Sequence, residues 1–214
     1  MSRDNSLLID RLVADLVPVP PLTRNGGLLR AGLAALATIA STIMVSGVRP
    51  ELGAGKVGAV FLLASGLFLV LAYAAIYGVI QSSRPRVGNR QSGWLWASAM
   101  AALLPAGALV TLVLAWGGHG GAALDREGWR CLGAGLLAGL VTGAVLVVWL
   151  RRGAPTSPVR AGLMTGIASG SIGIFAFGLS CPHDSLAHIG LWHGGAVLAS
   201  ALLGRFVVPP LIRW

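Results

Sequence analysis

Long apolar runs alternate with short polar stretches along the chain. Most runs hold about 20 residues with few charges, which is the length that an α-helix needs to cross the hydrocarbon core of a bilayer. The gaps between the runs are short and hold the charged residues, whereas many glycines sit inside the apolar runs. The pattern therefore predicts an all-α, polytopic membrane protein. Its six expected transmembrane helices cover residues 28–47, 57–80, 94–116, 131–150, 160–180 and 189–208.

The distribution of Lys and Arg predicts the orientation of these helices. Twelve of the sixteen basic residues lie in the N-terminal tail, the second and fourth loops and the C-terminal end. The opposite side holds Arg49, Lys56, Arg126 and Arg130. Because cytoplasmic loops carry the excess of basic residues, both termini are expected to be cytoplasmic. The loops around 48–56, 117–130 and 181–188 then face outward, which in a bacterium is the periplasm.

This orientation divides the chain into three parts. Residues 1–27 form a cytoplasmic tail, residues 28–208 form the six-helix transmembrane domain, and residues 209–214 form a short cytoplasmic C-terminus.

Composition agrees with a membrane protein. The chain is 55% hydrophobic and 11% charged, whereas soluble domains carry about 25% charged residues. A net charge of +9 would indicate nucleic-acid binding in a soluble protein. Here the basic residues flank membrane spans, so the expected partner is the lipid bilayer and no direct contact with nucleic acid is expected.

The interiors of the predicted spans contain no Asp, Glu or Lys. Ion-coupled transporters usually need such buried groups for relay or coordination. No catalytic constellation stands out either, so an enzyme is not expected. A regulatory binding protein, a transporter for metals or small molecules, and a membrane thiol oxidoreductase remain the alternatives at this point.

The two cysteines are expected to meet near the outer surface. Cys131 opens the fourth span and Cys181 closes the fifth, and the two helices are consecutive and antiparallel. Each helix also carries glycines four residues apart, which allow close packing of helix backbones. These glycines are Gly135, Gly139 and Gly143 in the fourth span, and Gly162, Gly166 and Gly170 in the fifth.

The stretch 180-SCPHDSLAHIGLWHGG-195 gathers titratable groups around Cys181. The pair Cys131 and Cys181 could form a structural disulfide, act as a reactive pair, or bind a soft metal transiently. The candidate metal ligands beside them are His183, His188 and His193. Pro182 should end the fifth span, and Asp184 could cap the helix that follows. No cofactor is required.

The tail contains an amphipathic segment, 6-SLLIDRLVADLVPVPP-21. Ser6 could cap this helix and Pro18 would stop it. Its apolar stripe is not accompanied by the Lys and Arg of surface-bound membrane helices, so it is better suited to a groove on a partner protein. The stripe consists of Leu8, Ile9, Leu12, Val13 and Leu16.

Several stretches resemble the NrsF-like negative regulators of extracytoplasmic-function sigma factors, a bacterial family of six-span inner-membrane proteins. The tail 8-LIDRLVADLVPVPPL-22, the motif 181-CPHD-184 followed by Trp192, and the ending 209-PPLIRW-214 are similar to the family's segments. Cys131 matches the family's other cysteine in position. His193 departs from the family, in which an aromatic residue often follows the Trp.

The resemblance implies an anti-sigma factor in the bacterial inner membrane. Such a protein would hold an extracytoplasmic-function sigma factor through its tail and keep it from RNA polymerase. By resemblance, Cys131 and Cys181 would sense heavy metal or oxidant and cause release. We hypothesise that this signal shifts the fourth and fifth spans against each other and thereby moves the loop 151–159 and the tail.

Overall fold

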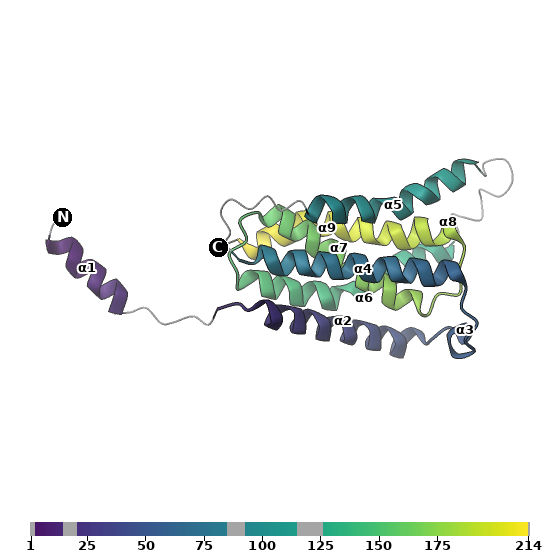
Figure 1. Ribbon diagram of the computed structural model, residues 1–214, viewed down its shortest axis with the longest axis horizontal. Helices are drawn as coiled ribbons and strands as arrows, with labels where there is room; N and C mark the ends of the chain where they lie inside the picture. Colours follow the sequence, from purple (N-terminus) through teal and green to yellow (C-terminus); the bar gives the residue numbers. More distant parts are fainter. Residues whose placement is uncertain (1–2, 15–20, 85–92, 115–125, 214) are drawn as a thin grey trace.

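The computed structural model describes residues 3–14, 21–84, 93–114 and 126–213, and this part of the chain is helical without strands. Its elements are α1 (Arg3–Ala14), α2 (Arg24–Ser46), α3 (Pro50–Gly53), α4 (Ala59–Ser82), α5 (Gly93–Leu114), α6 (Arg126–Arg151), α7 (Pro158–Gly178), α8 (Leu186–His188), a π-helical turn (Ile189–His193) and α9 (Gly194–Ile212). Figure 1 shows α2 and α4 to α9 packed side by side as one bundle. The predicted all-α fold is confirmed.

Five segments in the described residues are long and apolar enough to cross a membrane. They are Arg24–Ser46, Ala59–Ser82, Glu127–Arg151, Pro158–Gly178 and Leu186–Ile212. The last one joins α8, the π-helical turn and α9, and it begins earlier than the predicted 189–208. The remaining predicted span, 94–116, falls on α5, a 22-residue helix with Pro105 inside it. α5 is not among the five, so a sixth span stays a prediction.

The outer faces of the bundle are apolar, as lipid contact requires. Several large side chains on α2, α4, α6 and α9 are more than half exposed on these faces. A soluble protein of this size would bury most of such a surface. These side chains include Leu33, Leu36, Leu62, Leu63, Leu137, Leu140, Leu202 and Phe206.

Helix α7 is the centre of the bundle and packs on α4, α6 and α9. In the most apolar stretch of α7, 78% of the residues are buried inside the protein. The corresponding share is 44% or less in the other four candidate spans. The prediction that α6 and α7 pack closely is confirmed, because a methyl group added at Gly139 would overlap the Ser169 backbone. Gly173 of α7 belongs to the same contact, since a methyl group there would overlap the backbone of Gly135 and Gly139. The glycines of α7 that the sequence pointed to serve a different contact. Gly162 and Gly166 face Gly204 and Ser200 of α9, since α7 must present small residues to both of its neighbours.

The tail helix α1 is drawn apart from the bundle in Figure 1. Its side chains of Ile9, Leu12 and Val13 are about half exposed or more. The helix begins at Arg3, so the expectation that Ser6 caps it is wrong; Ser6 lies inside the first turns. The side chain of Leu8 and all of Leu16 fall outside the described residues.

The two ends of the bundle are chemically different. At the end where α2 begins, Arg84 donates to the carbonyl of Leu22, and the amide of Ala154 donates to the carbonyl of Ser83. These contacts join the tail side of α2 to the loops after α4 and α6. The opposite end holds α3, the segment around Cys181 and the start of α6, and the candidate site lies there (Figure 1).

Candidate functional site

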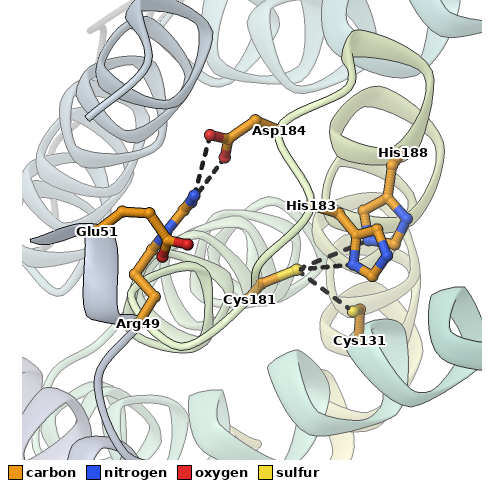
Figure 2. Close-up of polar contacts among 7 residues, drawn as sticks. All are labelled: Arg49, Glu51, Cys131, Cys181, His183, Asp184 and His188. Atoms are coloured by element: carbon orange, nitrogen blue, oxygen red, sulfur yellow. Dashed lines mark hydrogen bonds and ion pairs between the residues drawn. The ribbon is translucent and has the colours of Figure 1, made fainter. Parts of the chain in front are cut away.

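Cys131 and Cys181 lie side by side without a disulfide between them, with their Sγ atoms 3.7 Å apart. Cys131 is in the first turns of α6, one turn before Gly135, and Cys181 follows the end of α7. Both are buried, with 5% and 2% of their surfaces exposed. The predicted meeting of the two cysteines is thus found at the contact between α6 and α7 (Figure 2).

Two of the three candidate histidines complete this cluster. The Nε2 atom of His188 lies 3.8 Å from Cys181 Sγ. Four buried residues bring one possible ligand atom each to within 4.8 Å of the other three. They are Cys131, Cys181, His188 and His193. Within the described residues, Nε2 of His193 is buried without a hydrogen-bond partner.

The helix that carries these histidines has an irregular start. Ser185 caps α8 by accepting a hydrogen bond from the amide of His188, so the expectation that Asp184 is the cap is wrong. In a regular α-helix, residues five apart point about 140° away from each other. The π-helical turn Ile189–His193 has bonds of i to i+5 type. It therefore brings His193 to the face of His188, where their ring centroids are 5.5 Å apart.

His183 lies next to the cluster but not in its centre. Its Nδ1 is 4.0 Å from Cys181 Sγ and its ring stacks on His188 with centroids 4.7 Å apart. Its Nε2 lies 3.1 Å from a carboxylate oxygen of Glu127 at the start of α6. Of its side chain, 36% is exposed. His183 therefore bridges two segments at the edge of the site.

Arg49 is a site residue that the sequence analysis counted only as an outer-side charge. Its side chain is 4% exposed and forms two hydrogen bonds to Asp184, of 2.6 and 2.9 Å. It also contacts Glu51 at 3.4 Å and lies over the ring of Phe61. The bond to Asp184 is the main reason why the pKa of Arg49 is raised above its ordinary value. Figure 2 shows this ion pair beside Cys181.

The remaining motif residues shape the surroundings of the cysteines. Pro182 directly follows Cys181, and α7 already ends at Gly178, before Pro182. Trp192 is buried, and its ring meets Trp129 edge-on with centroids 4.9 Å apart. A side chain at Gly128 would collide with the Trp192 ring, so a glycine is needed there. Trp192 thus fixes the start of α6 against the π-helical turn.

The environment favours the thiolate form of Cys181. Its hydrogen bond with Cys131 lowers the pKa of Cys181 far below that of an ordinary thiol. Contacts with His188 and His193 act in the same direction and together outweigh burial, which disfavours charge. A thiolate beside imidazoles can react with oxidants or bind soft and borderline metal ions.

The family model for "Negative regulator of sigma F", NrsF, matches residues 12–214. The chain belongs to the NrsF family. It is 30% identical over 213 residues to "Anti-sigma-F factor NrsF" of Caulobacter vibrioides (strain NA1000 / CB15N), with 97% of this chain and 98% of that protein covered. It is 25% identical over 181 residues to "Probable anti-sigma-F factor NrsF" of Azospira oryzae (strain ATCC BAA-33 / DSM 13638 / PS), with 78% of each covered.

Members of the NrsF family are regulators and not enzymes. The resemblance that the sequence motifs indicated is therefore confirmed over nearly the whole chain. No solved structure matches this chain.

Proposed function

We propose that this NrsF-family protein is an anti-sigma factor of the bacterial inner membrane. It holds an extracytoplasmic-function sigma factor through its tail and releases it when Cys131 and Cys181 meet heavy metal or oxidant. The observation that carries the proposal is that α2 has the tail at one end and the cysteine site at the other. The helix begins next to the tail, and its other end contacts the cysteine site through Gly47 and Arg49.

The tail supports the binding half of the proposal. Helix α1 has an apolar stripe and polar residues on its other faces, and its described apolar side chains are about half exposed or more. An amphipathic helix of this kind binds by placing its apolar face in a hydrophobic groove. The sigma factor that the family name implies would supply that groove.

The cysteine cluster supports the sensing half. Two sulfur atoms 3.7 Å apart can be joined by an oxidant or bridged by a soft cation after a small movement. Either event adds a bond between α6 and the segment after α7. A signal changes the sigma-factor affinity only if it favours one of two conformations of the bundle.

Contacts at the far end offer a route from α6 and α7 to the tail. The Trp149 ring nitrogen donates to the Ser83 hydroxyl, and the amide of Ala154 donates to the Ser83 carbonyl. The next residue, Arg84, binds the Leu22 carbonyl just before α2. Movement of the loop 151–159 would therefore reach the segment that precedes α2.

The orientation rests on the basic residues. Several arginines lie toward the end of the bundle where α2 begins, namely Arg24, Arg84, Arg152, Arg160 and Arg213. By the positive-inside rule this end would be cytoplasmic. The cysteine site would then face the periplasm. With α5 as a sixth span, both termini would be cytoplasmic.

The deciding experiment is a mild-detergent pull-down from the native host. Full-length protein is compared with a variant lacking residues 2–20, and bound proteins are identified by mass spectrometry. A sigma factor bound by the intact protein and lost with the truncation would support the proposal and its binding site. Absence of any sigma factor from both samples would overturn it.

A further inference from the structure

The cysteine–histidine cluster has the composition and spacing of a tetrahedral metal site. In a zinc site with bonds of about 2.3 Å to sulfur, the two sulfurs lie about 3.8 Å apart. The Sγ atoms of Cys131 and Cys181 are 3.7 Å apart. A sulfur and an imidazole nitrogen on the same ion lie about 3.6 Å apart, and Cys181 Sγ is 3.8 Å from His188 Nε2.

The fourth ligand would be His193, which has a buried ring nitrogen without a hydrogen-bond partner among the described residues. Nε2 of His193 is buried, and no other atom of the described residues forms a hydrogen bond with it. A buried polar nitrogen without a partner is costly. A ligand atom of His193 already lies within 4.8 Å of those of the two cysteines and His188, so a shared ion would satisfy the histidine.

From these contacts we infer that the resting protein binds a zinc ion through Cys131, Cys181, His188 and His193. The zinc site deepens the proposed function. Only the regulatory consequence of zinc binding rests on that function; zinc binding itself does not. Transient capture of a soft metal by two thiols that hold no ion is a different event, because here the thiolates already have a cation before any signal arrives.

The charge of the site suits a divalent ion at this depth. Two thiolates balance Zn²⁺, so four buried ligands and the ion form a neutral unit, which burial penalises little. Two thiolates without a cation would place two negative charges next to each other in a buried site. A disulfide would need the sulfurs at about 2.05 Å and would leave Nε2 of His193 without a partner.

Neighbouring groups complete the site without entering it. His183 stacks on His188, and its outer nitrogen contacts Glu127. Asp184 is occupied by Arg49, so its carboxylate is not available as a ligand. His183 is therefore the matched control, because its Nδ1 lies 4.0 Å from Cys181 Sγ but the residue is outside the group of four.

The regulatory consequence concerns how the signal acts. Thiolates bound to zinc are protected from disulfide formation, so the resting site would tolerate an oxidising compartment. A softer cation, which thiolate ligands prefer, would act by replacing zinc rather than by filling an empty site.

The test uses full-length protein purified in detergent. Zinc per chain is measured by elemental mass spectrometry, and the affinity is followed by titrating Co²⁺ and recording its thiolate-to-metal absorption. We expect one zinc per chain in the wild type and in His183→Ala. Cys181→Ser should weaken the Co²⁺ thiolate absorption, because one sulfur ligand is lost. Both Cys181→Ser and His193→Ala should weaken binding by about 100-fold or more.

Absence of metal from the wild type at micromolar free zinc would overturn the inference. Equal affinities in His193→Ala and His183→Ala would do the same. Because a variant could fail to fold, X-ray absorption on the zinc-loaded wild type provides a second test. We expect two sulfur and two nitrogen ligands around the zinc. Any other set of ligands contradicts the site. The pull-down of the sigma factor is scored separately, so either idea can fail while the other stands.

Discussion

Arg49 and Asp184 form a bidentate ion pair although 135 residues separate them, with N–O distances of 2.6 and 2.9 Å. The pair joins the end of α2 to the segment that carries Cys181. Two further bonds run between the same segments, from the Arg49 amide to Leu179 and from the Ser180 hydroxyl to Gly47. The cysteine site is therefore attached to the helix that begins next to the tail.

Breaking this ion pair should destabilise the protein. Asp184→Asn removes the closer of the two carboxylates beside the buried Arg49 and leaves only the longer contact with Glu51. This loss costs about 3 kcal/mol, the low end of the range because Asp184 is partly exposed and Glu51 remains. Thermal unfolding in detergent measures the change. Glu51→Gln is the control, since Glu51 is 46% exposed and its contact is longer. Equal losses in the two variants would show that the bidentate geometry has no special weight.

Replacing the cysteines should remove the response and not the repression. In Cys131→Ser and Cys181→Ser the tail is unchanged, so a sigma-dependent reporter should stay repressed in unstressed cells. Addition of cadmium or peroxide should no longer induce it, because the sulfur ligands and reductants are absent. Normal induction in the double variant would contradict the assignment of Cys131 and Cys181 as sensors.

The apolar stripe of α1 should determine sigma-factor affinity. Leu12→Ala together with Val13→Ala removes side chains that are 60% exposed each and would be buried by a partner. With about 1.5–3 kcal/mol for each large side chain buried, the affinity should fall by at least about 10-fold in a binding titration. Asp10→Asn, on another face of α1, is the control and should bind normally. The stripe has no role in binding if both variants bind equally.

The contact between α7 and α9 should not tolerate a larger residue. A side chain at Gly166 collides with the backbone of Ser200 and Ala201, whereas the space beside Gly66 on α4 is open. Gly166→Leu should therefore cost about 3 kcal/mol or more, seen as a lower midpoint of thermal unfolding. Gly66→Leu should leave the midpoint nearly unchanged. Comparable midpoints for both would mean that α7 and α9 can separate without loss.

Much of this protein follows from its sequence because membrane insertion depends on local composition. Runs of about 20 apolar residues predict helices in lipid wherever they occur, and five of the six predicted spans are found as long apolar helices. The meeting of Cys131 and Cys181 could also be predicted, since consecutive antiparallel helices place their adjoining ends at the same depth.

Other features depend on contacts between distant segments. The sequence could not show that Gly162 and Gly166 face α9, because glycines four residues apart fit any close neighbour. Nor could it pair Arg49 with Asp184, since the partner of a buried charge is decided by the packing around it.

The site itself shows the same division. Its ligand types, two cysteines and nearby histidines, are visible in the sequence. The selection of His188 and His193 over His183 comes from the π-helical turn Ile189–His193. That turn changes the regular spacing of the helix and places residues five apart on one face. The change occurs where Trp192 packs against Trp129 at the start of α6.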